Sequence, residues 1–266
     1  MAQPAHSGWH WRIWAAEGAG TALMMLGGLS AVCLTFGSGS PLAEALPSDS
    51  VRRLVVGGLF AACVSLVAVS PLGRLSGAHL NPAVTLSFRV LGRVSGRDVG
   101  GYLAVQLIGA LAGTAVVRLL WGSTALSVDG GATLVGTGLA AAVALEAAMT
   151  AVLIGVILYF VSDRRLAPWT PLAIWPVITA LVWIGSPYTG TSLNPTRSAA
   201  PALVFSELAD LWVYLAAPIV GAVVLAALWR RRDRAFQPKT AKQFHDPRYR
   251  CCLGTDMPAV PASPGG

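Results

Sequence analysis

The chain has 266 residues, of which 55% are hydrophobic and only 12% are charged, and its mean hydropathy is +0.63. Soluble domains are usually about 25% charged, so this composition excludes an ordinary water-soluble core and indicates a membrane protein. The net charge of +7 does not indicate nucleic-acid binding, because residues 230–266 hold eight basic and three acidic residues and so contribute 8 − 3 = +5 of it. A basic tail beside anionic lipid is the simpler explanation.

Six apolar stretches are long enough to cross a bilayer, which takes about 20 residues. The first, residues 18–43, has no ionisable residue except the weakly acidic Cys33. It is too long for the apolar core of a signal peptide, about 7 to 15 residues, so we interpret it as a retained span. The other predicted spans are 54–71, 99–121, 135–161, 169–186 and 211–229.

The first and fourth spans each carry one carboxylate: Glu17 directly precedes residues 18–43, and Glu146 lies within 135–161. A charge buried in hydrocarbon costs about 3 kcal/mol or more, so each should face the protein interior and have partners. Irregular backbone at membrane depth also needs hydrogen-bond partners. We therefore expect Glu17 and Glu146 to accept hydrogen bonds from two loops, described next, and to brace them. The alternative is that each carboxylate simply lies near a span end.

Two loops carry the same pattern. Residues 77–85 read Gly-Ala-His-Leu-Asn-Pro-Ala-Val-Thr, and residues 190–198 read Gly-Thr-Ser-Leu-Asn-Pro-Thr-Arg-Ser. Asn favours a helix N-cap and Pro the first helical turn, so the loops predict helices over 82–90 and 195–205. Both are too short to span a bilayer. They are typical of re-entrant half-helices, whose N-termini carry a partial positive charge of about +0.5.

The chain also repeats as a whole. Residues 102–110 and 214–222 are identical at five of nine positions, with an offset of 214 − 102 = 112 residues. Asn81 and Asn194 are separated by 194 − 81 = 113 residues. Three spans per repeat is an odd number, so the second repeat should be inverted relative to the first. The two half-helices should then enter from opposite faces and meet.

Basic residues are concentrated on one predicted side. The links after spans two and four are rich in Arg, and the tail after span six opens Arg-Arg-Arg-Asp-Arg, whereas the link after span three has Asp129 and no Lys or Arg. The positive-inside rule therefore places both termini in the cytoplasm. Arg52, Arg53 and Arg118 go against this assignment.

No motif predicts an enzyme, a metal site or a cofactor. The histidines at positions 6, 10, 79 and 245 are scattered and accompany no nucleophile motif. The four cysteines have no metal-ligand spacing, although Cys251 and Cys252 could carry a lipid. Residues 257–266 are rich in Pro and Gly, which predicts disorder.

The paired Asn-Pro loops, the Arg after the second of them, Glu17, Glu146 and Gln106 resemble those of the aquaporin (major intrinsic protein) family over about residues 12–229. The resemblance implies an all-α membrane protein, a right-handed bundle of six transmembrane helices plus two re-entrant half-helices around one pore per subunit, in a homotetramer. The repeats would occupy about 12–121 and 135–229. A cytoplasmic N-terminus (1–11) would precede them, and a basic, disordered cytoplasmic tail (230–266) would follow.

The Asn-Pro motifs would form the waist of that pore. Each Asn amide can donate a hydrogen bond to the oxygen of a passing water, which turns the hydrogens of that water toward its neighbours in the file. Together with the positive helix ends, this orientation breaks proton hopping and repels cations. Arg197 would line an outer constriction, unless it forms a structural ion pair. His79 would line the cytoplasmic side of the pore, or else pack within its loop. The waist residues are Asn81, Pro82, Ala83, Asn194, Pro195 and Thr196, the last standing where the family usually has Ala.

The resemblance assigns the other walls of the constriction to Val182, Thr191 and either Phe60 or Ala61, because residues 70–76 carry one extra residue. Water-selective members usually have His where this chain has Val182, and a smaller apolar side chain should widen the ring. Glycerol facilitators have Asp after the Arg, where this chain has Ser. The positions that resemble the nodulin-26-like branch and its bacterial relatives are Ser198, Ala202, Tyr214 and Leu215.

The sequence therefore predicts a passive channel for water and small uncharged solutes such as glycerol, urea or undissociated metalloid acids, located in the plasma (inner) membrane and excluding protons and ions. Its partners would be these solutes, membrane lipid and further copies of the chain. A water-selective channel is the nearest alternative. A secondary transporter would need more titratable groups along the path, and a structural protein with a silent pore would show no conductance.

Overall fold

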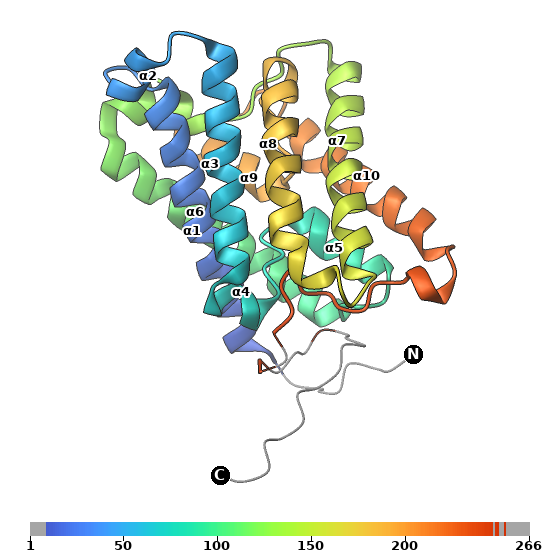
Figure 1. Ribbon diagram of the computed structural model, residues 1–266. Helices are drawn as coiled ribbons and strands as arrows, with labels where there is room; N and C mark the ends of the chain where they lie inside the picture. The colour runs from blue at the N-terminus through green and yellow to red at the C-terminus, as the bar shows by residue number, and fades with distance from the viewer. Residues whose placement is uncertain (1–8, 247, 250–252, 254–266) are drawn as a thin grey trace.

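The computed structural model describes residues 9–246, 248, 249 and 253 (Figure 1). Every regular element in these residues is a helix. Six helices are long and apolar enough to cross a membrane, as the sequence predicted. They are α1 (Trp11–Phe36), α3 (Asp49–Val69), α6 (Gly96–Leu126), α7 (Leu139–Val161), α8 (Thr170–Thr189) and α10 (Leu211–Arg230).

Short helices join the long ones. Two of them, α5 (Pro82–Val90) and α9 (Pro195–Phe205), are the half-helices that the Asn-Pro pairs predicted, with the same bounds. The others are α2 (Pro41–Ala45), α4 (Pro71–Ser76) and the 3-10 turns η1 (Asp129–Gly131), η2 (Ala167–Trp169) and η3 (Arg234–Phe236). Residues 70–76, which carry the extra residue noted above, form α4 together with its cap Ser70.

The first span differs from the prediction at both ends. α1 begins at Trp11 rather than residue 18, because Glu17 lies inside the helix and is fully buried rather than marking its end. It stops at Phe36, where the chain turns through Gly39 (φ 74°) before Pro41 starts α2. The third span, predicted over 99–121, extends to Gly96 and Leu126 with a break at Gly122 (φ 47°, ψ −119°).

The two repeats pack in the same way. α1 lies against α6 in the first repeat and α7 against α10 in the second, while each half-helix packs on the third helix of the other repeat, α5 on α10 and α9 on α6. Equivalent glycines permit the close helix crossings. A Cβ on Gly109 would lie 2.1 Å from the backbone oxygen of Gly18, and one on Gly221 would lie 2.0 Å from that of Ala147. Any side chain at either position would force the helices apart.

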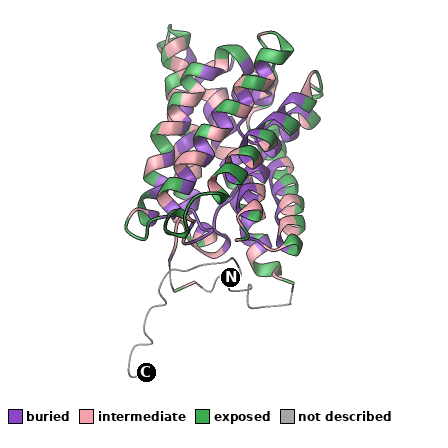
Figure 2. Cartoon of the chain, turned by 90° about the vertical axis from the view of Figure 1, so that its right-hand side faces the viewer, coloured by how far each residue is buried: buried purple, intermediate pink, exposed green. Residues whose placement is uncertain are grey.

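The outward faces of the bundle are apolar. Figure 2 shows exposed residues on the outer sides of the helices and buried residues between them. Single exposed apolar residues are common on soluble proteins, but an apolar surface of this extent marks contact with lipid or with other protein. Large exposed apolar side chains on the long helices include Leu23, Leu66, Ile108, Leu119, Ile184 and Val220.

The chain beyond α10 differs from the expected disorder. The tail predicted to be disordered begins at residue 230, yet Thr240, Ala241 and Lys242 are completely buried. In Figure 1 this segment runs back from α10 across the lower end of the bundle toward α4. Residues 257–266, Cys251 and Cys252 lie outside the described residues.

Candidate functional site

The two Asn-Pro loops have the same irregular backbone. Ala78 and Leu80 in the first loop and Thr191 and Leu193 in the second have φ values of 52°, 53°, 53° and 57°. Residues other than glycine rarely adopt this left-handed conformation, and each instance costs about 1–3 kcal/mol unless its surroundings enforce it. Other contacts must therefore hold both loops in shape.

In the first repeat a buried carboxylate makes such contacts. Glu17 accepts through Oε1 a hydrogen bond from the backbone N–H of Leu80 at 2.5 Å and another from Nε2 of Gln106 at 2.9 Å. Gln106 also donates to Oγ1 of Thr85, at the start of α5. The carboxylate of α1 is thereby joined to the loop, to the half-helix and to α6.

The second repeat has the equivalent arrangement. Glu146 on α7 accepts hydrogen bonds through Oε1 from Oγ1 of Thr189 at 2.7 Å and from the backbone N–H of Ser192 at 2.9 Å. Its Oε2 accepts from the backbone N–H of Leu193 at 3.1 Å. Each of the two carboxylates thus lies against the loop of its own repeat, and each is completely buried.

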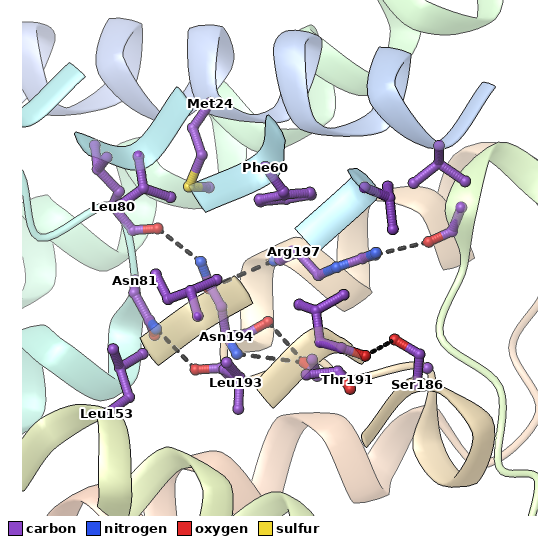
Figure 3. A pocket seen from close by; sticks show the side chains of 18 of the residues that line it. Met24, Phe60, Leu80, Asn81, Leu153, Ser186, Thr191, Leu193, Asn194 and Arg197 are labelled. Atoms are coloured by element: carbon purple, nitrogen blue, oxygen red, sulfur yellow. Dashed lines mark hydrogen bonds between the residues drawn. The ribbon is translucent and has the colours of Figure 1, made fainter. Parts of the chain in front are cut away.

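The two Asn residues cap their half-helices and also bond across to the opposite loop. Nδ2 of Asn81 donates to the carbonyl oxygen of Leu193, and Nδ2 of Asn194 donates to that of Leu80, both at 2.8 Å (Figure 3). Their Oδ1 atoms accept backbone N–H groups of α5 and α9. An amide nitrogen has two N–H groups, so each Asn keeps one donor beyond its loop contact.

A cavity of about 380 Å³ passes along this pair of amides. Six residues were assigned to the waist, and only the two Asn residues among them border the cavity. The other four are buried and do not reach it: Pro82, Ala83, Pro195 and Thr196. Thr196 donates through Oγ1 to Oδ1 of Asn194 at 2.9 Å, so it holds the Asn side chain rather than changing the width of the waist.

Arg197 lies farther along the same cavity. Its Nη1 donates to the carbonyl oxygen of Gly131 at 2.7 Å, and its guanidinium carbon lies 5.4 Å from the centroid of the Phe60 ring. No ion pair of Arg197 occurs within the described residues. Val182, Thr191 and Phe60 also border the cavity, whereas Ala61 is completely buried in the core and does not reach it. The sequence left Phe60 and Ala61 as alternatives, and of the two only Phe60 borders the cavity, beside Arg197.

A sequence model of the family described as Major intrinsic protein matches residues 5–229 of this chain. The chain belongs to that family. It is therefore a multi-pass integral membrane protein of the aquaporin type.

Similar proteins agree with the family. Over 179 residues the chain is 35% identical to "Aquaporin NIP1-1" of Zea mays, covering 67% of this chain and 62% of the relative. Over 164 residues it is 38% identical to "Nodulin-26" of Glycine max, covering 61% and 59%. The matched segment thus spans about three fifths of the length of these relatives. The X-ray structure of the aquaglyceroporin from Plasmodium falciparum shares the fold, with a TM-score of 0.68, 23% identity, and coverage of 84% of this chain and 96% of that one.

In this major intrinsic protein His79 both borders the cavity and packs within its loop, combining the two alternatives that the sequence left open. Its Nδ1 lies 3.0 Å from Oγ1 of Thr85, its ring stacks on that of Phe88, and its Nε2 lies 2.8 Å from the carbonyl oxygen of Ala241. The contact with Ala241, far along the chain, was not predicted.

Several other residues that border the cavity were not predicted from the sequence, and two of them carry long polar side chains. Arg53, near the start of α3, borders one end of the cavity, and Gln243 of the C-terminal segment borders the other end. No hydropathy or motif signal distinguishes either of them, because both positions depend on how distant segments pack. The described residues contain no cluster of three His, Cys, Asp or Glu side chains that could hold a metal ion.

Proposed function

We propose that this major intrinsic protein conducts water and small uncharged solutes, foremost glycerol and also urea or undissociated metalloid acids such as arsenite, and excludes protons and ions. The observation that carries the proposal is a single cavity bordered by the amides of Asn81 and Asn194 and by Arg197. Apolar side chains supply most of the remaining wall, including Met24, Val64, Leu153, Ile157, Ile174 and Ile178.

The geometry of the waist supports exclusion of protons. Each Asn uses one N–H on the opposite loop and keeps one for the cavity, so a water molecule between them can receive two hydrogen bonds. That water would turn both its hydrogens toward its neighbours in the file and break a chain of proton hops. The N-termini of α5 and α9 add partial positive charge at the same place, which opposes cations.

The region around Arg197 governs which solutes pass. Val182 offers an apolar surface where an imidazole would add a donor and bulk, which favours glycerol-sized solutes. The ring of Phe60 beside the guanidinium acts in the other direction, because it occupies part of the same cross-section. Phe60 is therefore the observation that favours the second candidate function, a water-selective channel.

We further propose a homotetramer in the plasma (inner) membrane, with residues 12–229 as the channel domain and both termini cytoplasmic. Two of the three arginines that oppose this orientation, Arg52 and Arg118, have local partners. Arg52 donates to the carbonyl oxygens of Leu46 and Ala43, both at 2.5 Å, and Arg118 donates to that of Val204 at 2.5 Å. Such capping roles account for basic residues on the side that the positive-inside rule disfavours.

Stopped-flow light scattering on purified protein in liposomes tests the solute class. Water and glycerol gradients are compared for the parent chain and for Val182→His, with arsenite and boric acid to follow. We expect both solutes to pass through the parent, and glycerol flow to fall at least ten-fold in the variant while water flow persists. Water flow without glycerol flow in the parent would support the water-selective alternative, and no flow of either would refute the proposal.

A further inference from the structure

The C-terminal segment covers one end of the cavity. After α10 the chain turns through η3, where Nε1 of Trp229 donates to the carbonyl oxygen of Phe236 at 2.8 Å. The backbone N–H of Lys239 then donates to the carbonyl oxygen of Val161, the last residue of α7, at 2.7 Å. These contacts direct the following residues beneath the bundle (Figure 1) rather than away from it.

Residues 240–246 attach to the segment that leads into the first Asn-Pro loop. The backbone N–H of Gln243 donates to the carbonyl oxygen of Gly77 at 3.0 Å, and Nζ of Lys242 donates to that of Arg74 at 2.5 Å. Nη1 of Arg74 lies 3.1 Å from Oδ2 of Asp246. Together with the contact between His79 and the carbonyl oxygen of Ala241, four attachments within residues 241–246 join the tail to α4 and its loop.

The two ends of the cavity differ in their access to solvent. At the end distant from the tail, Phe36 and Arg53 are partly exposed and Pro187 is exposed. At the tail end, His79 is 1% exposed and Gln243 is 2% exposed. The cavity is therefore open on one side and covered by the tail on the other.

Gln243 faces this cavity with an unused polar atom. Its side chain borders the cavity, and its buried Oε1 has no hydrogen-bond partner within the part of the chain that the structure describes. A buried acceptor without a partner is unfavourable, and a water molecule or solute hydroxyl in the cavity would satisfy it. The tail thus adds a pore-facing group as well as a cover.

We propose that residues 239–246 form a gate that closes the channel mouth on the side of α4 and α5, with Gln243 as its pore-facing residue and a water molecule or solute hydroxyl as the ligand of its amide. The gate rests on the proposed channel function. Release of the segment from Gly77, Arg74 and His79 opens the mouth, and its return closes the mouth again.

The test compares the full chain with a chain ending at Gln237 and with Lys242→Glu, which keeps the full length but sets a carboxylate against the carbonyl oxygen of Arg74. Asp233→Asn is the matched control, because Asp233 is an exposed tail residue whose side chain caps nothing in η3. Water permeability per reconstituted channel is measured by stopped flow. Hydrogen exchange of the peptide spanning 238–246 reports docking independently of conduction.

We expect at least five-fold faster water flow from the shortened chain and from Lys242→Glu, loss of exchange protection at Gln243 in Lys242→Glu, and parent behaviour from Asp233→Asn. If the shortened chain does not fold, Lys242→Glu decides alone. Equal flow through the conducting full chain and the variants would overturn the gate and leave the channel function standing. If no form conducts water although residues 238–246 of the full chain are protected from hydrogen exchange, the channel function is overturned, and the gate with it.

Discussion

The replacement Glu146→Ala tests how the second loop is held. It removes the acceptor of three hydrogen bonds, from Thr189, Ser192 and Leu193, in a place that solvent does not reach. A buried donor left without a partner costs about 1–3 kcal/mol, so the two backbone N–H groups alone account for roughly 2–6 kcal/mol. The left-handed residues Thr191 and Leu193 then also lose what enforces their conformation, at about 1–3 kcal/mol each.

The sum is comparable with the whole stability of a typical domain, about 5–15 kcal/mol. We therefore expect Glu146→Ala to lower the yield of folded protein in detergent and to abolish water flow in liposomes. Glu146→Gln keeps one acceptor oxygen and should be intermediate, and Glu44→Ala, at an exposed acid in α2, should behave like the parent. If Glu146→Ala expressed, assembled and conducted like the parent, the bracing role of this carboxylate would be refuted.

Three further outcomes are expected. Thr196→Ala removes one hydrogen bond to Asn194 and should lower the free energy of unfolding by about 0.5–1.5 kcal/mol, with water flow within two-fold of the parent; a large loss of flow would mean that Thr196 contacts the solute. Gly109→Leu should prevent folding, because its Cβ would meet the backbone of α1. A Cβ at the exposed Gly100, on the same helix, would meet no atom within 4 Å, so Gly100→Leu should elute like the parent in size-exclusion chromatography; equal elution of both variants would contradict the packing argument. Burial, reinforced by Lys242 and opposed by Asp246, lowers the pKa of His245 from its ordinary 6.5, so the docked tail binds fewer protons than a free tail and docking weakens as pH falls below 6.5. The hydrogen bond with Arg248 is the main cause that lowers the pKa of Asp246 to about 2. The stability contributed by the charged Asp246 carboxylate is therefore lost only as the pH falls from 3.8 to about 2, below the range in which His245 acts. Water flow through the full chain should therefore rise between pH 7 and pH 5, less so in His245→Asn, and a flat profile would contradict this.

Local chemistry explains which elements could be predicted from the sequence. The starts of α5 and α9 were predicted correctly because an Asn cap followed by Pro defines a helix start within two residues. The start of α1 was predicted wrongly because hydropathy treats an acid as the end of an apolar run, and only the distant partners Leu80 and Gln106 explain why Glu17 is buried.

The candidate site divides in the same way. Asn81, Asn194 and Arg197 stand in recognisable motifs, and the structure brings them to one cavity. The choice between Phe60 and Ala61 depended on the rotation of α3, which one extra residue before the loop obscured. The position of Gln243 could not be predicted, because the tail docks largely through backbone groups and few of its side chains are apolar.

The crossed hydrogen bonds of the two Asn amides also determine when the centre of the molecule can form. Asn81 needs the carbonyl oxygen of Leu193, and Asn194 needs that of Leu80, so neither repeat contains both partners of either bond. During synthesis the first loop therefore lacks the partners that its amide and carbonyl groups have in the folded protein until the second loop has been made. Maturation of the centre is thus a single late step that joins two half-proteins, and separately expressed halves should acquire it only on meeting in one membrane.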